Sequence, residues 1–132
     1  MNVTQPIYHL VGAAEYQAQP LDQPYAPGSL RQEGFIHCTA EKSLLIEVAN
    51  AFFADSGVEL LVLVIDPQRL TARLVFEPPV PPVHASEQTS FNPPPQTLFP
   101  HLYGPLNREA VLDIFALARK TNGRWCWPPG KE

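Results

Sequence analysis

Basic residues are scarce in this chain of 132 residues. It holds 9 lysines and arginines against 13 aspartates and glutamates, which gives a formal net charge of −4. Domains that bind the nucleic-acid backbone usually carry a basic patch, so this balance argues against that class of protein. It leaves open a small anionic ligand that is held by a few groups.

Cysteines and long hydrophobic runs are also few. Cys38 and Cys126 form no motif with each other, and we expect both to be reduced and unpaired. The first ten residues contain neither the basic stretch nor the apolar stretch of a signal peptide. The longest apolar run, residues 60–65, is too short to cross a bilayer. These features predict a cytoplasmic protein without a membrane segment.

Proline, by contrast, is abundant. There are 16 prolines, and nine of them lie between Pro78 and Pro105. Because proline lacks an N–H group and fixes φ, this region is not expected to form central sheet or a long helix. We expect a proline-rich loop over residues 78–100, within a single domain that spans residues 1–132. The 45% apolar content is enough for a packed core without metals or disulfides.

The apolar patterning predicts an α+β protein with short elements. The expected strands cover residues 7–11, 35–38, 58–65, 72–77 and 99–102, and the expected helices cover residues 13–19 and 40–54. The stretch 111–118 suits either a helix or a strand. The hairpin signal Asn122-Gly123 and the partner stretch 124–127 favour a strand there.

The helix over residues 40–54 has a predicted start and a predicted buried face. Thr39 is a residue type that caps helix N-termini, so we expect it to cap this one. The face that should pack on the sheets is apolar at helical spacing. It consists of Leu44, Leu45, Val48, Ala49 and Phe52.

Three of the four histidines end or interrupt apolar stretches. They are His9 in "IYHL", His37 in "GFIHCT" and His101 in "FPHLYGPL", whereas His84 lies in the proline-rich region. Strand ends that are distant in sequence can meet in space, so these three histidines are candidates for one cleft. Each could equally be a half-buried histidine with a purely structural role.

The tripeptide "HCT" at residues 37–39 alternates along its strand. His37 and Thr39 share one face, and Cys38 points to the other, where it should pack in the core. This alternation argues against a Cys38 nucleophile. A zinc site is disfavoured too, because residues 37 and 38 point to opposite faces and no pair of candidate ligands has the short spacing typical of zinc.

Two further residue types are candidates for a site. Glu77 is the carboxylate that closes an apolar strand, in "ARLVFEPP". It is either a solvated strand end or a site residue. Tyr8, Tyr25 and Tyr103 either line a pocket or belong to the core with a solvated hydroxyl group.

The sequence resembles a known bacterial family named domain of unknown function 952. The segments "IYHL", "YAPGSL", "EGFIHCT", "LLVLVID", "LVFE" and "FPHLYGPLN" occur in the order seen in that family, over residues 7–125. The chain departs from the family pattern at Thr39, where serine is usual, and at residues 15–16, where the family tends to have a tryptophan. The insert "PPVPPVHASEQTSFNPPPQ" is a third departure, and it affects the rim of any cleft.

The resemblance implies a fold similar to that of ADP-ribosyltransferases. In that fold two small splayed sheets surround a cleft, with helices packed outside, and the cleft holds NAD. By position, His9 matches a first-strand histidine that contacts ribose, and His37 and Thr39 fall in the second motif. Glu77 and His101 are the candidates for the third motif, which is catalytic. Ser29 and Tyr103 lie in matched segments and join the expected ligand-binding residues.

The resemblance and the residues together leave several functions open. The first is an enzyme that transfers ADP-ribose from NAD or hydrolyses it, with NAD as substrate and with no required cofactor or metal. The second is a non-catalytic module that binds a nucleotide or another small anion. The third is a partner-binding protein that uses the proline-rich loop. The ligand expected in the first two cases is a small nucleotide-like molecule, and the sequence leaves the oligomeric state open.

Overall fold

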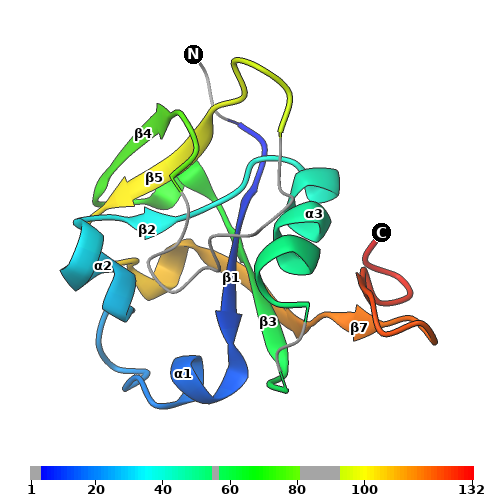
Figure 1. The fold of residues 1–132 in the computed structure, drawn as a ribbon. Coiled ribbons are helices and arrows are strands. Elements are labelled where there is room, and N and C mark those ends of the chain that lie inside the picture. The colour runs from blue at the N-terminus through cyan, green and yellow to red at the C-terminus, as the bar shows by residue number, and fades with distance from the viewer. Residues whose placement is uncertain (1–3, 55–56, 81–92) are drawn as a thin grey trace.

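A three-stranded antiparallel sheet runs through the middle of the computed structural model, which describes residues 4–54, 57–80 and 93–132 (Figure 1). Its strand order is β1-β3-β6, with bounds Ile7–Gly12, Leu60–Ile65 and Val111–Ala116. The central strand β3 is almost entirely buried because both of its faces are covered. The strands predicted at residues 7–11, 58–65 and 111–118 are thus confirmed in kind. Val58 lies before β3 and is 50% exposed.

A second antiparallel sheet has the strand order β2-β5-β4. Its strands are Ile36–His37, Phe99–Tyr103 and Arg73–Glu77. In the register of this sheet His37 lies opposite His101. In Figure 1 the second sheet lies beside the upper part of the first sheet. The predicted strands at residues 35–38, 72–77 and 99–102 are confirmed with shifted ends.

Pro100 corrects the expectation that the proline-rich region contains no central sheet. The residue lies in β5, the middle strand, so the predicted loop over 78–100 ends earlier than expected. The Pro100 carbonyl accepts a hydrogen bond from the Cys38 N–H at 3.0 Å. The side of Pro100 that lacks an N–H group therefore faces the end of β2. Because β2 and β5 pair no further beyond this point, the absence of that donor breaks no later hydrogen bond between them. Residues 81–92 of the proline-rich region lie outside the described residues.

In the described part of the chain, three α-helices accompany the sheets. They are α1 (Ala13–Gln17), α2 (Gly28–Glu33) and α3 (Lys42–Phe52). The first and third were predicted, whereas no helix was expected where α2 lies. The Thr39 cap is wrong, because Glu41 occupies the N-cap position of α3 and no side chain caps it. On the predicted face Leu44, Leu45 and Ala49 are buried.

Short elements complete the fold. The 3₁₀ turns η1 (Pro67–Arg69) and η2 (Arg108–Ala110) flank the sheets, and the Asp66 side chain caps η1. The hairpin signal is confirmed, since β7 (Ala118–Arg119) pairs with β8 (Trp125–Cys126) across the turn that contains Gly123. The coarse prediction of an α+β protein is therefore confirmed. Asn107 stands at the start of η2, but its side chain bonds the backbone of Arg69 and Thr71 instead of capping the turn.

The core has two parts. One cluster, which includes Ile7, Ile36, Leu63 and Leu102, fills the space between the two sheets. The other lies on the opposite face of the first sheet, where α3 and the β7–β8 hairpin cover it. The two cysteines are free, as predicted, and Cys38 lies in the first cluster. Among the described residues, no helix has the length and apolarity that a membrane span requires.

Candidate functional site

A cavity of about 280 Å³ lies where β1, α2 and β2 meet. Four of the seven sequence-predicted site residues line it. We call it the histidine cavity, and the lining residues used below are His9, Tyr25, Ser29, Glu33, His37 and Thr39. Of the four predicted residues, Ser29 comes from the first turn of α2, a helix that the sequence analysis did not foresee. The fold thus brings the two sequence motifs around His9 and His37 to one place.

His9 lies in the wall of the histidine cavity with both ring nitrogens bonded. Its Nδ1 is 2.6 Å from the His37 carbonyl oxygen, and its Nε2 is 3.0 Å from the Tyr25 hydroxyl. The carbonyl oxygen can only accept, so Nδ1 carries the proton and Nε2 accepts from Tyr25. Burial lowers the pKa of His9 to about 4, and the imidazole is neutral at physiological pH. His9 therefore fastens β1 to β2.

Tyr25 is held from both sides. Its ring is fully buried, its backbone pairs with Leu106, and burial raises the pKa of its hydroxyl group. The loop before it is fixed by Arg108, whose guanidinium donates to the Pro20 and Gln23 carbonyls and to the Tyr16 hydroxyl. This anchoring keeps the Tyr25 hydroxyl in place for His9.

His37 and Glu33 form a hydrogen-bonded dyad on the cavity wall. The His37 Nε2 lies 2.7 Å from Glu33 Oε2, and both side chains are largely shielded, with 23% and 14% of their surface exposed. Gly34 makes this contact possible, because it ends α2 with φ at 86°. That left-handed residue turns the chain so that β2 runs back past the last turn of the helix. In the neutral form of His37, Nε2–H donates to the carboxylate and the other ring nitrogen has a lone pair.

The alternation predicted for residues 37–39 is confirmed. His37 and Thr39 both line the cavity, whereas Cys38 packs between the sheets, where burial raises the pKa of its thiol to about 12. Thr39 is buried and its backbone exchanges two hydrogen bonds with Tyr8, at 2.7 and 2.8 Å. Thr39 therefore pairs with β1 through an isolated bridge beyond the end of β2 and does not cap α3.

Glu77, His101 and Tyr103, the other predicted site residues, gather beside Phe35. We call these four residues the Phe35 cluster. The His101 ring stacks on Phe35 with centroids 4.1 Å apart. Glu77 Oε1 accepts from His101 Nδ1 at 2.7 Å and from the Tyr103 hydroxyl. These bonds join β4 to β5 on the sheet face that points away from the core.

The ionisation of the Phe35 cluster follows from these contacts. The hydrogen bond from Tyr103, followed by the one from His101, lowers the pKa of Glu77. The same bond to Glu77 raises the pKa of Tyr103. Burial lowers the pKa of His101, and the Glu77 hydrogen bond opposes that shift. The cluster therefore holds a carboxylate beside an imidazole that stays neutral near pH 7.

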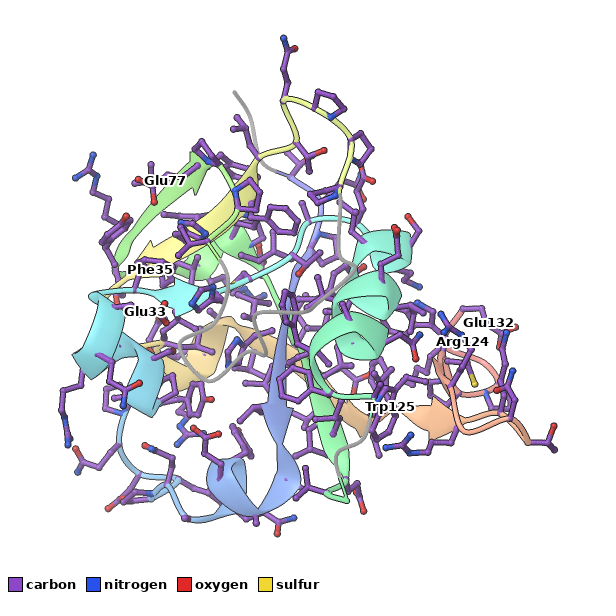
Figure 2. All side chains as sticks on the ribbon, in the orientation of Figure 1. Glu33, Phe35, Glu77, Arg124, Trp125 and Glu132 are labelled. Carbon is purple, nitrogen blue, oxygen red and sulfur yellow. The ribbon has the colours of Figure 1, made fainter. Side chains whose placement is uncertain are left out.

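His9 bonds the His37 backbone and the His37 and His101 rings are neighbours, but the three histidines do not share one cavity as predicted. The His37 ring lies 5.8 Å from the His101 ring, and the Phe35 ring contacts both, at 4.8 and 4.1 Å. His101, Glu77 and Tyr103 are absent from the cavity lining formed by described residues. Phe35 is buried and packs against both imidazoles, so the site divides into the histidine cavity and the Phe35 cluster. Figure 2 shows Glu33, Phe35 and Glu77 on one side of the molecule and Trp125 on the other.

Sequence reasoning missed Glu33 and Phe35. Glu33 lies four residues before His37, but that spacing brings the side chains together only because α2 ends at Gly34. The sequence signal was the glycine after a short polar stretch, and it became readable only with the helix known. Phe35 was expected only as the first residue of the strand over residues 35–38. Within the described residues, no three histidines, cysteines or carboxylates gather in a way that could hold a metal ion.

Comparison with known protein families identifies the family of this chain. A family described as "Protein of unknown function (DUF952)" matches residues 10–114. The chain belongs to the DUF952 family. The match includes His37, Thr39, Glu77 and His101, and it begins one residue after His9. This confirms the family named from the sequence motifs.

A solved structure shows the same fold. It is the X-ray crystal structure of protein CC0527 from Caulobacter crescentus, which is 24% identical and has a TM-score of 0.67. The likeness covers 92% of this chain and 94% of that one, and a double mutant of the same protein gives equal values. At this identity the likeness shows the fold alone. No curated protein matches this DUF952 chain.

Proposed function

We propose that the histidine cavity binds the nicotinamide-ribose portion of NAD or of a related molecule and cleaves its glycosidic bond. The observation that carries the proposal is His37, backed by Glu33 at 2.7 Å and facing a cavity of about 280 Å³. Ser29 and Thr39 add hydroxyl groups to the same walls. The motif order supports the proposal, because it resembles that of proteins with an ADP-ribosyltransferase-like fold, and two small antiparallel sheets beside a cavity agree with that architecture.

The chemistry of the cavity suits this reaction. When the bond between ribose C1′ and the nicotinamide nitrogen breaks, the electron pair leaves with nicotinamide and the ribose becomes an oxocarbenium-like cation. A carboxylate near C1′ stabilises that charge, and Glu33 supplies one in a shielded position. Water then adds to C1′, and its proton passes to the His37 nitrogen that is not bonded to Glu33. If an acceptor hydroxyl group replaces water, the same steps transfer ADP-ribose.

The remaining predicted residues act in this proposal through His37. His9 fixes the His37 backbone, since both of its own ring nitrogens are used inside the protein. His101 packs against the His37 and Phe35 rings. Glu77 accepts hydrogen bonds from His101 and Tyr103 and so fixes the His101 ring. In this proposal Glu33 therefore takes the catalytic role for which the motif order had made Glu77 and His101 the candidates.

Calorimetric titration with NAD and chromatographic detection of released nicotinamide test the proposal together. We expect binding and slow release with the wild-type protein. His37→Ala should weaken binding several-fold to about tenfold, since one net hydrogen bond is worth about 0.5–1.5 kcal/mol. Glu47→Gln is the matched control, because Glu47 is exposed on α3 and lies outside the cavity lining. If neither NAD nor nicotinamide riboside binds, the proposal is wrong.

A second candidate is a binding module that performs no chemistry. It is favoured by the position of Glu77 and His101, the residues matched to the catalytic motif, outside the histidine cavity. The same experiment separates the two, because a binding module gives heat on titration but releases no nicotinamide. A partner-binding role for the proline-rich loop concerns residues 81–92 and lies outside the described residues.

A further inference from the structure

We infer that the histidine cavity selects a ribosyl glycoside whose base is positively charged and which carries no phosphate group. This inference rests on the proposed function and narrows its substrate class. Three observations on the cavity support it: its charge, its size and the composition of its walls. The class is represented by nicotinamide riboside, in which the pyridinium ring carries the positive charge.

The charge of the cavity wall is negative. Glu33 and Glu15 line the cavity, and no lysine or arginine does so among the residues that the structure describes. The Glu33 side chain is 14% exposed and hydrogen-bonded to His37, so its carboxylate lies in a shielded place on the cavity wall. Glu15 is exposed at the cavity wall and adds a weaker, screened charge. A cationic base is attracted to this wall, whereas a phosphate group would be desolvated beside carboxylates with no basic partner.

The size of the cavity points the same way. Its volume of about 280 Å³ lies just below the range of about 300–1,000 Å³ that is typical of small-molecule sites. A base with one ribose suits such a volume. The two phosphates and the adenosine of a dinucleotide would have to remain outside it.

The walls offer partners for both halves of a nucleoside. Leu10, Val48 and Phe53 provide apolar surface for a flat base. Ser29 and Gln32 provide polar groups for ribose hydroxyls, because each can donate and accept. The combination of apolar surface, neutral polar groups and carboxylates matches a cationic nucleoside better than a nucleotide.

Calorimetric titration with three matched probes tests this inference on the wild-type protein. Nicotinamide riboside carries the charge, its dihydro form has nearly the same shape without the charge, and nicotinamide mononucleotide adds one phosphate. We expect nicotinamide riboside to bind about tenfold or more tightly than either of the others, which corresponds to a difference of about 1.4 kcal/mol. Equal affinity for the charged and dihydro forms, or tighter binding of the mononucleotide, would overturn the inference.

Variants at the carboxylate sharpen the test. Glu33→Gln should remove most of the preference for the charged form over the dihydro form, whereas Glu47→Gln should keep it. If Glu33→Gln keeps the full preference, Glu33 is not the source of selectivity and the inference fails. Tighter binding of NAD than of nicotinamide riboside would leave the proposed function standing and overturn only the inference. Absence of binding by every probe would overturn both.

Discussion

The two three-stranded sheets use their faces differently. In the first sheet β3 is a run of apolar residues, and both faces of the strand are covered by core. In the second sheet Leu102 of β5 packs toward the core, while His101 and Tyr103 face away from it and bond Glu77. The first sheet therefore provides most of the buried apolar surface, and the second provides most of the groups that can ionise.

This difference has a physical cause. A polar group between two apolar layers is costly unless it is hydrogen-bonded, so a doubly covered sheet has little room for one. His9 is the exception on the first sheet, and both of its nitrogens are bonded. On the second sheet Phe35 covers the His101 imidazole, which is 1% exposed and hydrogen-bonded to Glu77, whereas the Glu77 and Tyr103 side chains reach solvent. Stability and chemistry thus depend on different sheets, and this separation can be tested.

The largest effect is expected from Leu45→Ala. Leu45 is 1% exposed in the cluster between α3 and the first sheet. Removing its side chain should lower the free energy of unfolding by about 2–5 kcal/mol. Leu112→Ala, at a residue of β6 that is 51% exposed, is the control and should change it by less than about 0.5 kcal/mol. Urea unfolding of both variants measures the difference, and similar values would mean that the helix face is assigned wrongly.

The next effect concerns His9 and pH. The pKa of His9 falls from 6.5 to about 4 on folding, so between these values the unfolded chain binds a proton that the folded protein does not. Stability is therefore complete above pH 6.5 and falls as the pH drops toward 4, by up to about 3 kcal/mol from this group. The pKa of His101 is also lowered, and this contribution is common to the wild-type protein and to the variant described next.

The variant His9→Asn isolates the contribution of His9. Its amide can still donate to the His37 carbonyl, but it does not titrate. Urea unfolding of the two proteins at pH 7.5, 6.0 and 4.5 should show a smaller loss of stability in the variant. Parallel pH profiles would show that His9 is not the titrating group.

A smaller effect is expected at Gly34, which joins α2 to the second sheet. Its φ of 86° is a conformation that costs other residues about 1–2 kcal/mol, so Gly34→Ala should destabilise the protein by about that amount. It should also shift Glu33 relative to His37 and weaken ligand binding. Gly28→Ala is the control, because Gly28 lacks a positive φ and has open space around it. If the two alanine variants melt at the same temperature, the left-handed conformation at residue 34 does not impose this cost on alanine.

The smallest effect on stability is expected from Tyr103→Phe on the exposed face of the second sheet. The hydroxyl group of Tyr103 is the main cause of the lowered pKa of Glu77. Its removal should raise that pKa toward the ordinary value for glutamate, with little change in melting temperature. An NMR titration of the Glu77 carboxyl group checks the shift. An unchanged pKa would mean that His101 alone holds the carboxylate.

The sequence was most informative where the physical rule is local. Strand periodicity placed His37 and Thr39 on one face and Cys38 on the other, and the structure confirms it. The hairpin at Gly123 followed from turn chemistry. The α2 helix escaped notice because six residues give too little periodicity to separate a helix from a turn. Pro100 lies in a central strand, although a proline-rich region was not expected to form one. A single proline fits there because the pairing of β5 with β2 ends at that residue.

The composition and patterning of the chain by themselves determined an α+β fold, free cysteines, and motifs of the DUF952 family, among which those around His37 and His101 lie within the family match. Only the tertiary structure decided that His9 is consumed by two internal hydrogen bonds, that Glu33 pairs with His37, and that Phe35 separates His101 from the cavity. Periodicity is a property of neighbouring residues, so it fixes which face a side chain occupies. Which groups meet across faces depends on chain reversals such as Gly34 and on the register between strands, and these are set by the packing of the whole molecule.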